Sequence, residues 1–367
     1  MSIFILLAFI FPPVGIPLLI VYFTKHKKGN PHPSENKDWY LQLALSREDA
    51  VSQWFLLLSV FFLGVTLLTL NRDIGDPLSW RTIMFLTSIV GLIITYYFKT
   101  ISTLIFSLIG IASWWGIQAM QWIQNKDIKT SSILAGLIFI ALLFYVLGHY
   151  HEKELKYKRF AFVYLILGII SITGALFIFS SKPGLEMLAE MTKGVTFFSS
   201  WEITTSLLIF ITALVGLTLY SASKNLILPA ETAAVFVLAI LFGITAFLPQ
   251  QTIFMQTGNY LDYYSGSGSE LSVNGVLWAI VFNFAVFFEL LGLIFSGYLR
   301  REEWLINIGA FFLFILIIVK YFDWFFTFLD KSLFFIGAGI LLFAVGWFME
   351  KSRRYMISNI KTEQQKT

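Results

Sequence analysis

Glu289 is the acidic residue best placed for chemistry, because it stands within the apolar run Phe288-Glu289-Leu290-Leu291. A carboxylate at the centre of a membrane helix costs about 2.5–3.5 kcal/mol, so such groups usually face the interior of a bundle and often serve function. Asn283 lies six residues earlier, roughly 120° away around a helix. Glu289 and Asn283 form a candidate intramembrane polar site for a proton or a cation. The alternative is a neutral or hydrogen-bonded acid that only holds neighbouring helices together.

Two glutamines, Gln118 and Gln121, extend this candidate polar site to a second apolar run. Their i,i+3 spacing puts them on one face of a helix, where they could line a polar cavity. Trp122 stands beside them and is typical of the aromatic belt at a membrane interface. The same glutamines therefore also fit an ordinary position at the end of a membrane helix.

A second candidate site consists of charged residues at the ends of apolar runs, namely Glu202, Lys320, Asp323 and Asp330. If these side chains converge, they form a charged pocket at the outer face, where carboxylates could serve a transferase acting on a lipid-linked substrate. If they lie apart, they are solvated helix ends whose long side chains reach water. Lys320 and Asp323 are spaced i,i+3 and are expected to pair on one helix face.

Several kinds of catalytic and cofactor site are missing from the sequence. The chain has no Cys, which excludes disulfides, thiolate nucleophiles and cysteine-ligated metals. The run His149-Tyr150-His151-Glu152 does not supply enough ligands at suitable spacing for a closed metal site. No Gly-rich phosphate loop and no zinc-protease motif occurs. We therefore expect no metal and no cofactor, and we favour a non-enzymatic protein.

The elements that must position these side chains are eleven apolar runs. Only 13% of the 367 residues are charged and 57% are hydrophobic, with a mean hydropathy of +0.76, whereas soluble domains carry about 25% charged residues. A bilayer core of about 30 Å needs about 20 helical residues. We predict an all-α, polytopic transmembrane helical bundle with spans at residues 3–23, 54–70, 82–98, 101–123, 131–148, 160–180, 203–221, 230–248, 276–295, 304–322 and 332–349.

The first of these spans, 3–23, has two interpretations. Pro12, Pro13 and Pro17 fall in its middle, and each proline inside a helix removes a hydrogen bond and clashes with the preceding turn. The segment is either a kinked spanning helix or a re-entrant segment buried in protein. A re-entrant segment would reduce the number of spans to ten.

The distribution of Lys and Arg predicts the orientation of the chain. If the loop 24–53 is cytoplasmic, 18 of the 26 basic residues lie inside and 8 lie outside. Because basic residues collect on cytoplasmic loops, this bias predicts an outside N-terminus and an inside C-terminus. The net charge of +4 then reflects topology rather than nucleic-acid binding.

No gap between the spans is long enough for a separately folded domain, so residues 1–367 are predicted to form a single transmembrane domain. The stretch 24–53 is expected to be a cytoplasmic linker with a short helix, opened by the capping-box residues Ser46-Arg47-Glu48-Asp49. A short amphipathic surface helix is predicted within 181–202. The polar tail 355–367 is expected to be disordered.

Several short motifs in the C-terminal third resemble a bacterial family of membrane proteins known only as a domain of unknown function. The matching residues are Asn283, Gly297-Tyr298-Leu299-Arg300-Arg301, Asn307-x-Gly309, Lys320-Tyr321-Phe322-Asp323, Phe335, Gly337-Ala338-Gly339 and Gly346-Trp347-Phe348-Met349-Glu350, with a looser match at Ser46-x-x-Asp49-Ala50. The family tends to have Arg in place of Lys320. The resemblance covers about 110 residues well and implies a multi-span envelope protein, with no catalytic residues to carry over. On this resemblance we expect the chain in the cytoplasmic (inner) membrane of a bacterium.

These observations favour a transporter-like protein or an assembly protein of a membrane complex. A membrane-embedded transferase and a purely structural subunit are the alternatives. A transporter predicts a polar cavity at Glu289, and a transferase predicts converging carboxylates above a lipid-accessible groove. The expected partner is the lipid bilayer, and a membrane protein partner or a second copy of the chain stays open.

Overall fold

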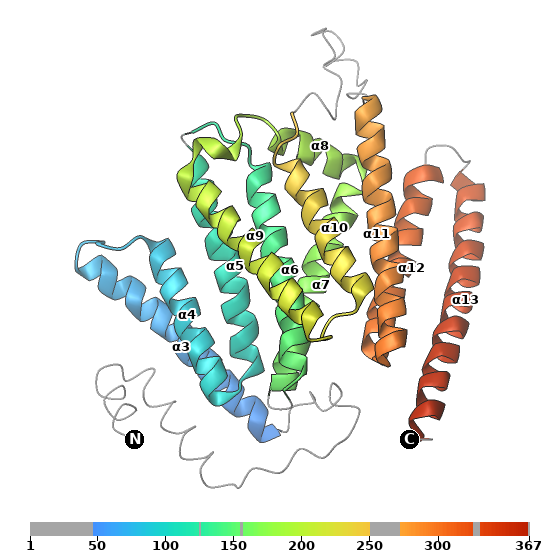
Figure 1. Ribbon diagram of the computed structural model, residues 1–367, viewed down its shortest axis with the longest axis horizontal. Helices are drawn as coiled ribbons and strands as arrows, with labels where there is room; N and C mark the ends of the chain where they lie inside the picture. The colour runs from blue at the N-terminus through green and yellow to red at the C-terminus, as the bar shows by residue number, and fades with distance from the viewer. Residues whose placement is uncertain (1–46, 125, 155–156, 250–271, 326–330, 366–367) are drawn as a thin grey trace. The chain divides into compact units, whose positions relative to one another are not determined.

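The computed structural model describes residues 47–124, 126–154, 157–249, 272–325 and 331–365 (Figure 1). These residues are mostly α-helical, and they contain no strand beyond the isolated bridge between Ile128 and Val195. Nine of the described helices are long and apolar enough to cross a membrane. The chain is therefore an integral, multi-pass membrane protein of helical fold.

The described helices match the predicted spans from 54–70 onward, one helix to each span. They are α3 (Arg47–Asp73), α4 (Trp80–Phe98), α5 (Ile101–Ile123), α6 (Ser131–Glu152), α7 (Lys158–Phe179), α8 (Lys182–Met191), the 3-10 helix η3 (Phe197–Ser199), α9 (Trp201–Ser223), α10 (Pro229–Thr245), α11 (Val273–Arg300), α12 (Glu303–Phe325) and α13 (Lys331–Gln365). The predicted span 3–23 lies outside the described residues. Because α10 has only 17 residues, the exact number of spans stays a prediction.

The two helices α4 and α5 form the tight hairpin that their short connection predicts. Lys99 ends α4 in the left-handed backbone conformation, with a φ of 58°, which reverses the chain within two residues. Small residues let the two helices approach closely: a side chain on Gly91 would collide with Ser107, and one on Gly110 would collide with Ser88. Such small-residue contacts are typical of helix packing in membranes.

The short helix predicted within 181–202 is present as α8. The Ser181 side chain accepts a hydrogen bond from the backbone N–H of Gly184, and Pro183 stands in the first turn, where it needs no hydrogen bond of its own. Leu185 and Leu188 are buried, while Glu186 is exposed. The presence of the predicted short helix is therefore confirmed, although the apolar Met187 is exposed rather than packed.

The predicted tail differs from the structure. The stretch 355–367, expected to be disordered, continues α13 as helix to Gln365. Two ion pairs support the last membrane turn of this helix, because Glu350 binds both Arg353 and Arg354 at i,i+3 and i,i+4 spacing. The following sequence contains no Gly or Pro that would end the helix. At the other end, α3 runs from Arg47 into the second predicted span, and the rest of the linker 24–53 lies outside the description.

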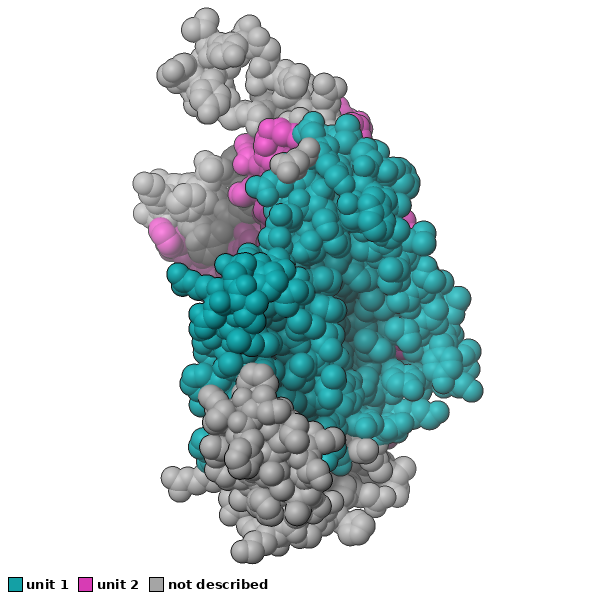
Figure 2. All heavy atoms as spheres, turned by 90° about the vertical axis from the view of Figure 1, so that its left-hand side faces the viewer, with its two compact units in different colours: residues 1–169, 194–226 teal, residues 170–193, 227–367 magenta. Residues whose placement is uncertain are grey.

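Two compact units can be distinguished among the described helices (Figure 2). Unit 1 comprises residues 1–169 and 194–226, and unit 2 comprises 170–193 and 227–367, so the division falls within α7. In unit 1, α6 is the most deeply buried of the candidate spans and packs against α5 and α9. In unit 2, α11 packs against α8, α10 and α12, and α12 packs against α13. The single-domain interpretation stays a prediction.

Candidate functional site

Glu289 lies in unit 2, where α11 contacts the second half of α7. The hydroxyl of Thr173 on α7 donates a hydrogen bond of 2.7 Å to Oε1 of Glu289. The other carboxyl oxygen, Oε2, is buried and has no hydrogen-bond partner among the described residues. An unpaired polar atom in an apolar interior costs about 1–3 kcal/mol, so this oxygen needs an explanation.

Asn283 and Lys320, which the sequence assigned to different candidate sites, meet at one backbone carbonyl of unit 2. The carbonyl oxygen of Ser180 accepts from Nδ2 of Asn283 at 3.1 Å and from Nζ of Lys320 at 2.6 Å. Ser180 directly follows the last residue of α7, where helix carbonyls lack partners within the helix and the helix dipole favours a cation. Lys320 thus neutralises the end of α7.

These contacts make a polar column with two levels along α7 and α11, defined here as Thr173, Glu289, Ser180, Asn283 and Lys320. Thr173 and Ser180 are about 10 Å apart along α7, and Glu289 and Asn283 are about 9 Å apart along α11. The two levels are therefore in matching register on two antiparallel helices. The buried side chains of Leu176 and Val286 fall between the levels in sequence, so the column is polar at both levels and apolar between them.

The two glutamines of the predicted polar site are on α5 in unit 1, whereas Glu289 is on α11 in unit 2. Oε1 of Gln118 accepts a hydrogen bond of 3.0 Å from Nε of Arg81 on α4, and Gln121 is exposed. Gln118 therefore serves to hold an arginine between α4 and α5. A common site of Glu289, Asn283, Gln118 and Gln121 stays a prediction.

The described members of the predicted outer-face cluster belong to both units. Glu202 lies in unit 1, where its carboxylate accepts from Nζ of Lys126 at 3.0 Å and from the hydroxyl of Ser200 at 2.5 Å. Lys320 lies in unit 2, as described above. Asp330 and the side chain of Asp323 lie outside the description. Convergence of these four residues, and the pairing of Lys320 with Asp323, stay predictions.

The loop that holds Lys126 also ties two connections of unit 1 together. The backbone N–H of Lys129 donates to the carbonyl of Val195 at 3.0 Å, and the N–H of Val195 donates to Asp127. Burial lowers the pKa of the Lys129 ammonium. This end of unit 1 is therefore ordered by backbone pairing and by the Lys126–Glu202 ion pair.

Glu231 is a buried charged residue that the sequence did not single out. Its side chain is only 7% exposed, and its carboxylate accepts from Arg300, from the hydroxyl of Ser296 and from the backbone N–H of Leu228. Glu231 stands in the first turn of α10, and Arg300 ends α11. Charges at helix ends usually reach water, so hydropathy carries no signal for this pair.

The two histidines of the run 149–152 point to different neighbours within unit 1. His151 Nδ1 donates to the Leu147 carbonyl at 2.7 Å, which leaves Nε2 to accept from the hydroxyl of Tyr96 at 2.8 Å. His149 Nδ1 lies 3.1 Å from Glu152. The described residues contain no group of three or more His, Cys, Asp or Glu side chains arranged to hold a metal.

Comparisons of the chain with protein-family models, with curated proteins and with solved structures give no match. The function must therefore be argued from the side chains themselves. What the helices establish is that this is a multi-pass integral membrane protein of helical fold.

Proposed function

We propose that this protein is a non-enzymatic, transporter-like membrane protein in which Glu289 takes up and releases a proton. The observation that carries the proposal is the buried Oε2 of Glu289, which has no hydrogen-bond partner among the described residues while Oε1 accepts from Thr173.

The unpartnered oxygen favours a binding role over a purely structural one. A hydrogen bond from the Thr173 hydroxyl needs only one acceptor oxygen, which a neutral amide would supply at lower cost in an apolar interior. A carboxylic acid is worth its insertion cost where the second oxygen receives a proton, a water or a polar group. Glu289 has this second oxygen buried and ready for such a partner.

The polar column supports a stepwise route to this acid. Asn283 and Lys320 provide a polar level at the end of α7, about 9 Å from Glu289 along α11. Buried Leu176 and Val286 separate the two levels, and an apolar barrier of this kind prevents free leakage of ions. Transport then requires a movement or a water that bridges the barrier in one state.

A flux measurement on reconstituted vesicles tests the proposal. Vesicles containing the protein and an internal pH dye are given a pH gradient and a membrane potential, and the internal pH is followed. We expect proton entry through the native protein, its loss in Glu289→Gln and partial retention in Glu289→Asp. The matched control is Glu190→Gln, since Glu190 is an exposed residue on α8 that pairs with Lys193. Absence of flux in the native protein, or undiminished flux in Glu289→Gln, would contradict the proposal.

An enzyme is less well supported, because the Glu202 carboxylate is engaged by Lys126 and Ser200 rather than free to act on a substrate. Charge-partnered carboxylates are poor general bases. Asp323 and Asp330 would have to supply the transferase chemistry.

We further propose the bacterial cytoplasmic membrane as the location, with the N-terminus outside and the C-terminus inside. The 18-to-8 distribution of basic residues supports this orientation. A reporter enzyme that is active only outside the membrane, fused after Thr367, should be silent. The same reporter placed in the loop between α5 and α6 should be active, and the reverse pattern would overturn the orientation.

A further inference from the structure

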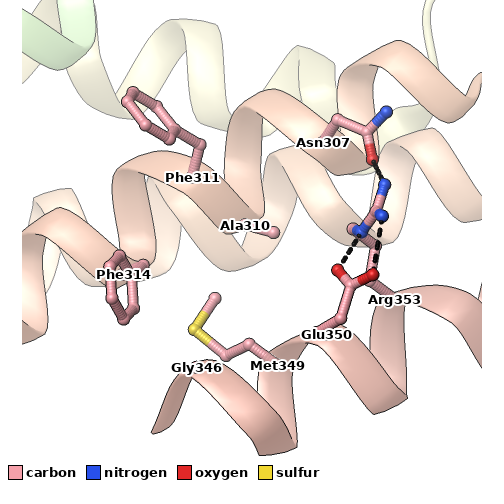
Figure 3. Close-up of a pocket in the computed structure, with 8 residues that line it drawn as sticks. All are labelled: Asn307, Ala310, Phe311, Phe314, Gly346, Met349, Glu350 and Arg353. Carbon is pink, nitrogen blue, oxygen red and sulfur yellow. Dashed lines mark hydrogen bonds and ion pairs between the residues drawn. The ribbon is translucent and has the colours of Figure 1, made fainter. Parts of the chain in front are cut away.

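A groove of about 330 Å³ opens between α12 and α13 in unit 2 (Figure 3). Its apolar lining comes from Phe311 and Phe314 of α12 and from Gly346 and Met349 of α13. At one end the lining becomes polar, where Asn307, Glu350 and Arg353 meet. The groove is therefore amphipathic along its length.

The polar end of the groove is preorganised by Arg353. Nη1 of Arg353 donates to Oδ1 of Asn307 at 2.7 Å, which links the two helices, and Nε and Nη2 donate to the two oxygens of Glu350 at 2.7 and 3.0 Å (Figure 3). Bidentate pairing of this kind fixes the guanidinium plane. Arg353 is thus a rigid cationic wall of the groove.

A further cation, Arg354, stands beside this end. It is 77% exposed and donates from Nε to Glu350 at 2.6 Å. Arg353 and Arg354 thus share the carboxylate of Glu350, while Glu303 lies near Arg353. The exposed guanidinium of Arg354 carries further N–H groups that can bind a phosphate.

The arginines of α13 lie at the end of the part of this helix that is apolar enough to cross a membrane. The apolar part of α13 that can cross a membrane ends at Tyr355, so residues 350–354 lie at the level where lipid headgroups begin. Trp347 and Tyr355 are exposed aromatic residues of the kind that mark this interface. The apolar part of the groove extends from there toward the hydrocarbon region.

We propose that the α12–α13 groove is a binding site for an anionic phospholipid. An acyl chain lies along Phe311, Phe314 and Met349, and the phosphate is bound by Arg354 beside Arg353. Basic side chains between membrane helices at the headgroup level recognise anionic lipids through this combination of charge and apolar wall. A free phosphate would not use the apolar wall. The site is independent of Glu289 and of proton movement.

Gly346 has no side chain and so leaves the groove open, which makes it the position where a substitution can fill the groove. A Cβ atom added to Gly346 would come within 3.8 Å of Phe314, an ordinary contact distance, so a side chain can leave the backbone here without a clash. A leucine at residue 346 would occupy the apolar part of the groove, where the acyl chain is proposed to bind. Gly339, two turns earlier on α13, has open space around it and does not line the groove, so Gly339→Leu is a matched control.

The experiment uses the full chain in phosphatidylcholine vesicles that contain a small fraction of phosphatidylglycerol with a photoreactive acyl chain. After illumination, the labelled peptides are identified by mass spectrometry. We expect labelling of the segments around Phe311–Phe314 and Gly346–Met349, strongly reduced labelling in Gly346→Leu, and unchanged labelling in Gly339→Leu. Arg354→Gln should lower the preference for phosphatidylglycerol over phosphatidylcholine about fivefold, the effect of one cation at a membrane surface.

Three results would overturn the site. Equal labelling by photoreactive phosphatidylcholine would show that the groove does not select an anionic headgroup. Unchanged labelling of Gly346→Leu, with a melting temperature equal to that of the native protein, would show that no acyl chain occupies the groove. Crosslinks from these segments to a second copy of the chain, in place of lipid, would assign the groove to self-association.

Discussion

Replacing Glu231 by Ala should destabilise the protein by about 3–5 kcal/mol, because the change leaves the Arg300 guanidinium buried without its counter-ion. The side chains of Arg300 and Glu231 are only 16% and 7% exposed, and the carboxylate also accepts from Ser296 and from the N–H of Leu228. All of these groups would lose their acceptor together. Chemical or thermal unfolding in detergent micelles measures the loss.

An exposed ion pair elsewhere in unit 2 provides the control. Glu190 is 66% exposed in its pair with Lys193, so Glu190→Ala should change the stability by less than about 1 kcal/mol. The double variant Glu231→Leu with Arg300→Leu should cost less than Glu231→Ala alone, since it buries no unpaired charge. If Glu231→Ala and Glu190→Ala prove equally mild, the Glu231–Arg300 pair is solvated and does not hold α10 to α11.

Replacing Glu289 by Lys should cost about 3 kcal/mol or more and lower the yield of folded protein, whereas Glu289→Gln should fold normally. A lysine at this position removes the acceptor of the Thr173 hydroxyl and places an ammonium in an apolar setting. The amide oxygen of Gln can still accept from Thr173. Expression level and melting temperature in detergent distinguish the two variants.

The contrast between these two variants also tests the burial of the site independently of transport. Glu186→Lys is the matched comparison, because Glu186 is exposed on the short helix α8, outside the candidate membrane spans, and the same change there should leave yield and melting temperature unchanged. Unchanged yield and melting temperature in Glu289→Lys would mean that water reaches residue 289. The proton-binding role would then need a different explanation for the unpartnered oxygen.

The sequence predicted the helices well because membrane spans are encoded locally. A run of about 20 apolar residues is sufficient to specify a spanning helix, and α4, α5 and α7 begin and end within two residues of the predicted boundaries. The short helix α8 was also predictable, since its N-cap Ser181, its Pro183 and its apolar spacing all lie within ten residues. The tail 355–367 was predicted wrongly because polarity was taken as disorder, although the segment lacks helix breakers.

The partners of the candidate residues could not be predicted in the same way. Thr173 contacts a residue 116 positions later, and Glu231 contacts one 69 positions later. Such pairs depend on how each helix is rotated and which helices are neighbours, and neither quantity is recorded in hydropathy. The Ser180 carbonyl is a backbone atom and carries no residue-type signal at all. Asn283 and Glu289 were found because a polar residue inside an apolar run is itself a local signal.

The deep burial of α6 has a consequence for how the protein is made. In the finished unit 1, 72% of the residues in the most apolar stretch of this helix are buried, and α9 covers part of it. The ribosome reaches α9 about 50 residues after the end of α6, which takes on the order of 2–10 s at typical synthesis rates. During this interval the face of α6 that later meets α9 is surrounded by lipid or by the insertion machinery. The same apolar face of α6 must therefore be stable in two environments, in contact with lipid while the chain is being synthesised and in contact with α9 once unit 1 has folded.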